Sequence, residues 1–139
     1  MPKTTVGDVE LYYEESGAGT PVVLIHGLAG DCSGWQSQIK VLEKNYRVIA
    51  LDNRGAGRSS ASDYPYTTRH FADDTIGLMD ALGVSEPAHV IGRSMGGAIA
   101  QEMAINYPGR VRSMLITASF GKLDRYGYQI LYNFNEVVK

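Results

Sequence analysis

One short stretch of the sequence has the residue types and spacing that nucleophilic chemistry requires. Gly92-Arg93-Ser94-Met95-Gly96 sets a serine between two glycines, directly after the strand-like residues His89-Val90-Ile91. Where a strand turns into a helix at such a serine, the backbone is strained so that the hydroxyl stands clear of the sheet, and the small flanking residues let strand and helix approach closely. Ser94 is therefore the candidate nucleophile.

The same turn supplies an electrostatic partner for that serine. Met95 opens the expected helix, and the N–H groups at a helix N-terminus are free to bind an anion. The Met95 N–H is placed to donate to an oxyanion that forms beside Ser94, where a donor lowers the barrier to acyl transfer.

Alternating strands and helices must position this turn. Residues on either side of Gly7-Asp8 predict an antiparallel hairpin over Thr4–Glu14. Further strands, expected to be buried, and helices are predicted at these ranges: strands Val22–Ile25, Tyr46–Leu51, His89–Ile91 and Val111–Thr117; helices Ser33–Lys44, Arg69–Leu82 with Thr67 or Thr68 as its cap, Met95–Tyr107, and one from Leu123 that includes Tyr126, Ile130, Phe134 and Val137. The expected class is α/β, with a mostly parallel sheet, an N-terminal antiparallel hairpin and helices on both faces.

The composition of the chain argues against several classes of partner. The chain has 139 residues and a formal net charge of −2, which suits one globular domain and offers no basic surface to nucleic acid. There is no signal-like N-terminus and no apolar run of transmembrane length, so we expect no membrane partner and a cytoplasmic location. The single cysteine, Cys32, fits a reducing compartment, and its expected role is that of a structural thiol. No metal-ligand spacing is present, so neither a metal nor another cofactor is expected.

Three motifs together resemble the α/β-hydrolase superfamily. They are Val22-Val23-Leu24-Ile25-His26-Gly27 ahead of Trp35, then Asp52-x-Arg54-Gly55-x-Gly57-x-Ser59, and then Gly92-x-Ser94-Met95-Gly96-Gly97. Within the superfamily, the chain is similar to the small 3-oxoadipate enol-lactonase, esterase and cofactor-free haloperoxidase group. The resemblance covers essentially all residues, and it implies a serine hydrolase that acts on carboxylic esters or lactones through an acyl-enzyme.

The resemblance also implies roles for single residues. Ser94 matches the nucleophile, the backbone N–H groups of Leu28 and Met95 match the oxyanion-hole donors, and His26 matches a histidine that supports the oxyanion loop. Asp52, Arg54 and Arg58 are expected to brace their own loop. Trp35, Arg93 and Phe120 are candidates for substrate contact, although core packing is the alternative for Trp35 and helix support for Arg93.

The base and the acid of a catalytic triad are missing from their expected places. In this superfamily they follow the nucleophile in the order acid, then histidine. The histidines of this chain are His26, His70 and His89, all of which precede Ser94, and we interpret His70 and His89 as ordinary polar residues of their elements. Asp124 follows the Val111–Thr117 strand, and we expect it at the surface or at a helix entry.

These absences lead to a hypothesis about the extent of the chain. We expect it to be the N-terminal part of a hydrolase and nearly inactive alone, with residues 1–122 as the first half of the core and 123–139 as the start of a cap or connecting helix. The Val111–Thr117 strand would then form an apolar edge that pairs with a second copy or with the missing half. The alternative is a non-catalytic binding or signalling protein on the same fold.

Overall fold

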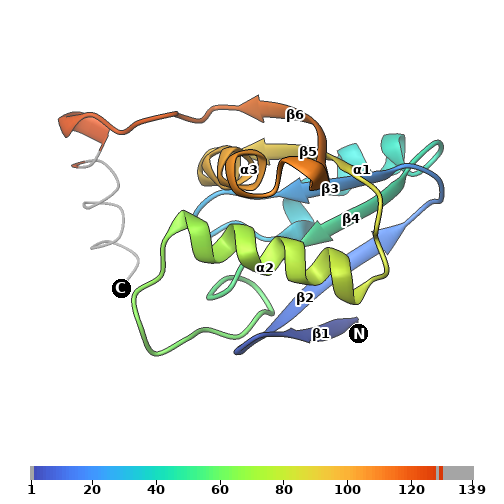
Figure 1. The fold of residues 1–139 in the computed structure, drawn as a ribbon, viewed down its shortest axis with the longest axis horizontal. Helices are drawn as coiled ribbons and strands as arrows, with labels where there is room; N and C mark the ends of the chain where they lie inside the picture. Colours follow the sequence, from blue (N-terminus) through green and yellow to red (C-terminus); the bar gives the residue numbers. More distant parts are fainter. Residues whose placement is uncertain (1, 128, 130–139) are drawn as a thin grey trace.

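A single six-stranded sheet forms the centre of the molecule, with strand order β1-β2-β4-β3-β5-β6 (Figure 1). The computed structural model describes residues 2–127 and 129. The elements are β1 (Lys3–Val6), β2 (Val9–Ser16), β3 (Pro21–Ile25), the 3-10 helix η1 (Cys32–Trp35), α1 (Gln36–Leu42), β4 (Arg47–Leu51), α2 (Thr68–Ala81), β5 (Ala88–Arg93), α3 (Met95–Asn106), the 3-10 helix η2 (Pro108–Arg110) and β6 (Val111–Thr117).

The sheet combines antiparallel and parallel strand pairs, as predicted. β1 and β2 form an antiparallel hairpin, and β2 is antiparallel to β4. β4, β3, β5 and β6 are parallel to their neighbours. The register pairs Ile25 of β3 with Gly92 of β5, so the loop after β3 and the turn after β5 leave the sheet side by side. The predicted α/β class is confirmed.

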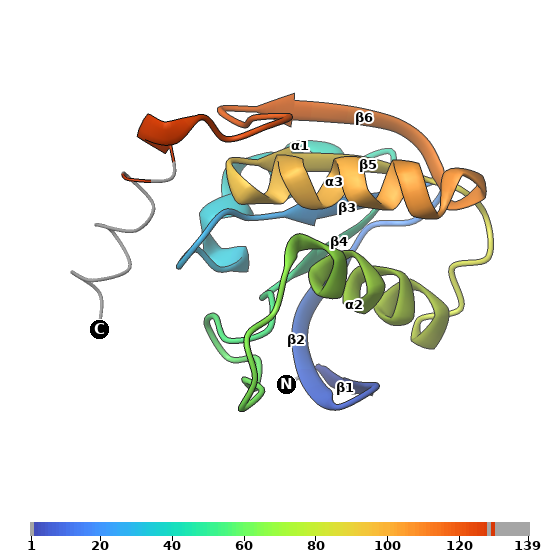
Figure 2. The ribbon, with the colours of Figure 1, turned by 60° about the vertical axis from the view of Figure 1, so that its left-hand side comes forward.

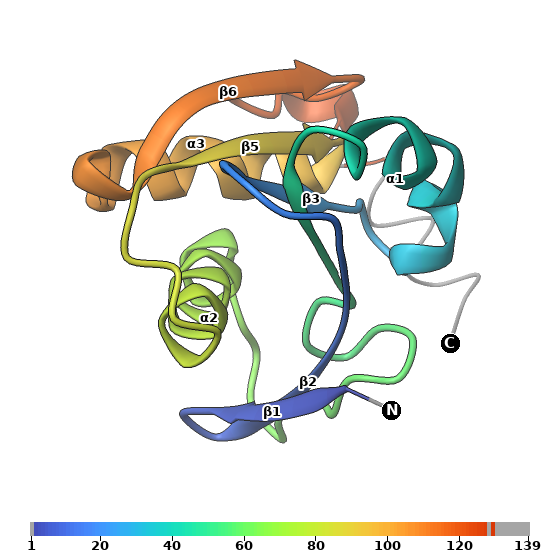
Figure 3. The ribbon, with the colours of Figure 1, turned by 90° about the vertical axis from the view of Figure 1, so that its right-hand side faces the viewer.

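Helices cover both faces of this sheet. α2 and α3 pack together on one face, with α3 along β5, whereas α1 lies on the other face (Figures 2 and 3). Successive strand residues alternate between the two cores: Val23 and Ile25 join the α2 and α3 side, whereas Val22 and Leu24 join Trp35 and the α1 side. Strands buried on both faces read as continuous apolar runs, which is why β3 and β4 were recognisable in the sequence.

Several expected elements differ in detail. The helix expected over Ser33–Lys44 is split into η1 and the short α1, because Asp31 caps a 3-10 turn by accepting a hydrogen bond from Ser33 N–H at 2.9 Å. The helices expected at Arg69–Leu82 and Met95–Tyr107 are shifted or shortened by one residue, and Thr67 is the N-cap of α2. Of the helix expected from Leu123, residues 125–127 and 129 are helical, while Ile130, Phe134 and Val137 lie outside the described residues.

The expectation that Val111–Thr117 is a buried strand was wrong. β6 is the last strand in the sheet, and every residue after the half-buried Val111 is exposed. Among the described residues the strand pairs with β5 on one side only, so it forms the apolar edge that was also expected. Among the helices formed by residues 2–127 and 129, none has the length and apolar character needed to span a membrane.

Candidate active site

The turn at Ser94 has the strained geometry of a nucleophile elbow. Ser94 links β5 directly to α3 with φ 56° and ψ −123°, a positive-φ conformation that non-glycine residues rarely adopt. The neighbouring glycines are required by close packing: a Cβ at Gly92 would overlap the Gly96 carbonyl, and a Cβ at Gly96 would overlap the Ile25 carbonyl. Strand, turn and helix therefore fit together only with glycine at these positions, and Ser94 itself stays partly accessible.

The loop after β3 lies against this serine. A Cβ on Gly27 would lie 2.8 Å from Ser94 Cβ and 3.2 Å from Ser94 Oγ, so the Gly27 backbone is in direct contact with the candidate nucleophile. Leu28 is the next residue, and Ala29 has a positive φ of 58°, which turns the loop sharply. The structure thus brings Leu28 and Met95, the two expected oxyanion donors, to adjacent strand ends beside Ser94.

His26 supports the loop and makes no hydrogen bond to Ser94. Its Nδ1 accepts a hydrogen bond from Gly27 N–H at 2.9 Å, and its carbonyl accepts one from Asn53 Nδ2 at 3.1 Å. Its ring meets Trp35 edge to face, with centroids 5.8 Å apart. These contacts fix the end of β3, where the loop that contains Gly27 and Leu28 begins.

The other histidines and Asp124 are engaged elsewhere. His70 Nδ1 accepts a hydrogen bond from Thr67 N–H at 3.0 Å and so completes the cap of α2, and His89 Nδ1 lies 2.7 Å from Ser113 Oγ. Asp124 Oδ1 accepts from Gly127 N–H at 2.8 Å, as a helix cap does. Within residues 2–127 and 129, therefore, no histidine and no carboxylate hydrogen-bonds to the Ser94 hydroxyl.

Asp52 connects the loop after β4 to η1 by hydrogen bonds. Its fully buried carboxylate accepts from Cys32 N–H at 2.7 Å and from Arg58 N–H at 2.8 Å. The Arg58 guanidinium in turn lies over the Tyr12 ring, 3.5 Å from its centroid. Burial raises the pKa of the Cys32 thiol well above its usual range, which disfavours the thiolate that a nucleophile needs.

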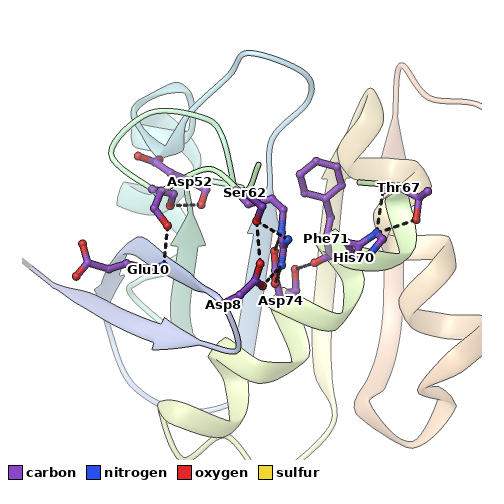
Figure 4. A network of polar contacts seen from close by, with 12 residues as sticks. Asp8, Glu10, Asp52, Ser62, Thr67, His70, Phe71 and Asp74 are labelled. Carbon is purple, nitrogen blue, oxygen red and sulfur yellow. Dashed lines mark hydrogen bonds and ion pairs between the residues drawn. The ribbon is translucent and has the colours of Figure 1, made fainter. Parts of the chain in front are cut away.

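Arg54 joins three distant parts of the chain. It donates to both carboxylate oxygens of Asp74 in α2, at 2.6 and 2.7 Å, and both side chains are almost fully buried. It also donates to Tyr64 Oη at 2.9 Å and Ser62 Oγ at 3.0 Å and contacts Asp8 at 3.3 Å in the β1–β2 turn. Figure 4 shows Asp8, Ser62 and Asp74 gathered in this network. The hydrogen bonds that Arg54 donates to Asp74 raise the pKa of the guanidinium, which stays charged. Sequence analysis found Arg54 and its bracing role but missed these partners, because they come from remote parts of the chain.

Comparison with known proteins decides the family. The family model described as the alpha/beta hydrolase fold matches residues 20–138. The chain belongs to this α/β-hydrolase family. A protein of Azorhizobium caulinodans provisionally named carbamate hydrolase RutD is 40% identical over 126 residues, which cover 91% of this chain and 47% of the relative.

Solved structures of α/β hydrolases are also similar to this chain. A thermophilic esterase from Thermogutta terrifontis superimposes with a TM-score of 0.83 at 33% identity, over 88% of this chain and 47% of the esterase. The enol-lactonase from Burkholderia xenovorans LB400 gives 0.84 at 28% identity, over 95% of this chain and 57% of the lactonase. The chain spans about half the length of the curated relatives it matches.

The three expected substrate contacts of this α/β hydrolase do not share one surface. Trp35 and Arg93 line a single groove between α1 and the end of β6, together with Thr117. Phe120 lines a different groove on the α3 side, beside Gln101. Trp35 is only 5% exposed, so most of its ring contributes to the core. Within the described part of the chain, no group of three or more histidine, cysteine, aspartate or glutamate side chains could hold a metal ion.

Proposed function

We propose that Ser94 is the nucleophile of a serine hydrolase that acts on carboxylic esters or lactones. Attack by Ser94 Oγ on the substrate carbonyl places negative charge on the carbonyl oxygen, and the Leu28 and Met95 N–H groups stabilise it. The alcohol or ring oxygen then leaves, and water releases the acid from the acyl-enzyme. The observation that carries this proposal is the strained, partly accessible Ser94 in contact with the Gly27 backbone.

The names of the similar proteins support acyl transfer. A carbamate, an ester and an enol-lactone all have a carbonyl carbon bonded to a heteroatom that can leave, so one mechanism serves all three. We propose that Trp35 and Arg93 contact the substrate from the α1 side and Phe120 from the α3 side.

The proposed activity needs a base and an acid from residues outside the 139 printed here. No histidine follows Ser94 in the sequence, and the three that precede it support other elements. A serine without a base is a weak nucleophile, and loss of triad partners costs several powers of ten in rate. We therefore propose that the 139-residue chain alone is nearly inactive.

We propose that the exposed β6 edge pairs with a second copy of the chain or with the segment that supplies these groups. Its apolar side chains and its unpaired backbone both favour such pairing.

A fluorophosphonate probe tests the proposed function. The probe should label Ser94 rapidly in a longer form of the protein that contains a downstream acid and histidine, and only slowly in the 139-residue chain. Ser94→Ala should abolish labelling, whereas Ser113→Ala, at an exposed serine on β6, should leave it unchanged. An unlabelled longer form would instead support a non-catalytic protein on this fold.

A further inference from the structure

The last residue of β6 and the segment directly after it are both hydrogen-bonded to the turn at Ser94. Ser94 N–H donates to the Thr117 carbonyl at 2.9 Å, and Ser119 Oγ donates to the Ser94 carbonyl at 2.6 Å. Gln101 Nε2 donates to the Phe120 carbonyl at 3.0 Å, which holds the far end of the segment against α3. The turn is therefore held by a neighbouring strand end as well as by its own helix.

Two features show that Ser119 is fitted closely to this place. Ala118 has a positive φ of 48°, an uncommon conformation for alanine, and this bend turns Ser119 back toward the turn. On the other side, a Cβ at Gly97 would overlap Ser119 Oγ, so the missing side chain of Gly97 makes room for the hydroxyl.

The Ser94 carbonyl belongs to the peptide unit that carries the Met95 N–H. A trans peptide is planar, so its C=O and N–H point in opposite directions and rotate together. Ser119 Oγ and Gly97 N–H, the latter at 2.9 Å, both donate to the Ser94 oxygen. By fixing that oxygen they fix the direction of the Met95 N–H on the opposite edge of the plane.

We propose that Ser119 is a positioning residue that aims the Met95 N–H at the oxyanion by holding the Ser94–Met95 peptide plane. This inference rests on the proposed function of Ser94. The Ser119 hydrogen bond also polarises the peptide, which makes the Met95 N–H a stronger donor. Because the Ser94 backbone is strained, it depends on such external contacts to keep its conformation.

Two measurements on matched variants test this role. In the 139-residue chain, Ser119→Ala should shift the Met95 amide resonance in a ¹H–¹⁵N NMR spectrum, and Ser119→Thr, which keeps the hydroxyl, should restore it. In the longer form, Ser119→Ala should slow fluorophosphonate labelling of Ser94 by about tenfold, the effect of losing one typical hydrogen bond. Ser113→Ala, at an exposed serine on the preceding strand β6, should change neither the Met95 resonance nor the labelling rate.

The outcomes separate this inference from the proposed function. An unchanged Met95 resonance in Ser119→Ala overturns the positioning role whether or not the protein is an enzyme. Normal labelling of Ser119→Ala beside a well-labelled wild type overturns the catalytic effect alone. A wild-type longer form that is never labelled overturns the proposed function and the catalytic effect with it. Thermal melting of each variant shows whether it is folded, and a slower rate counts only for a variant that melts cooperatively.

Discussion

At the scale of single residues, the buried ion pair between Arg54 and Asp74 predicts a large loss of stability when one partner is replaced. Removing Asp74 leaves the buried Arg54 guanidinium with the half-exposed Asp8 as its remaining carboxylate partner, and breaking a buried pair costs about 3 kcal/mol or more. Asp74→Asn should therefore lower the free energy of unfolding by about 3 kcal/mol in a urea titration followed by circular dichroism. Both side chains are less than one tenth exposed, so solvent screens this pair little.

Asp73, the residue before Asp74, is a matched control for Asp74→Asn. Asp73 also pairs with an arginine, Arg69, but both side chains are nearly half exposed. Such surface pairs contribute about 1 kcal/mol or less, so Asp73→Asn should have a small effect. Equal losses in the two variants would show that the Arg54 pair does not brace the loop.

Residue-level prediction from the sequence succeeded where one short motif determines the geometry. Ser94 and its neighbouring glycines form a continuous local pattern, so the strained turn was predictable. The partners of Arg54 were not, because Asp8 and Asp74 lie 46 and 20 positions away and nothing local marks them. Ser119 was missed for the same reason, since its hydrogen bond to Ser94 spans 25 positions.

At the scale of elements, the β1–β2 turn holds the loop after β4 through Asp8. Hydrogen bonds from Tyr64 and Ser62 keep the pKa of the Asp8 carboxyl below its ordinary value of 3.8. Because the folded-state pKa is the lower one, the contribution of Asp8 to stability is present above about pH 4 and is lost as the pH falls through the folded-state pKa. The difference in melting temperature between wild type and Asp8→Asn should therefore be largest near neutral pH and shrink below about pH 4.

Asp63, a carboxylate within the loop after β4, provides the comparison. Asp63 is exposed, and replacing it with asparagine should leave the melting temperature close to that of wild type from neutral to acidic pH. If Asp8→Asn and wild type differ by the same amount at all pH values, the Asp8 hydrogen bonds do not depend on its charge.

Elements were predictable where burial and periodicity agree. β3 and β4 are buried on both faces and were read directly from their apolar runs. β6 also has apolar residues, but it is exposed. Apolar residues in a sequence indicate a strand that is suited to burial, but they do not show whether another element packs against it. The division of Ser33–Lys44 into η1 and α1 depends on a cap by Asp31, which apolar spacing does not reveal.

At the scale of the whole molecule, the sheet ends in an open apolar edge. Met114, Leu115 and Ile116 are 41%, 52% and 39% exposed, and the outer backbone groups of β6 have no partner strand in the described part of the chain. An open edge of this kind is a template for another strand. The 139-residue chain should therefore associate as its concentration rises, which sedimentation velocity measures.

A charge on the edge should reverse that association. Leu115→Lys places an ammonium group where a pairing strand would bury it, so the associated fraction should fall. Ile105→Lys is the control, because Ile105 is 75% exposed but belongs to α3 and not to the β6 edge. If the chain stays monomeric at every concentration, the edge does not pair with a second copy. If both lysine variants reduce association equally, the contact surface includes α3, and the open edge is not what directs it.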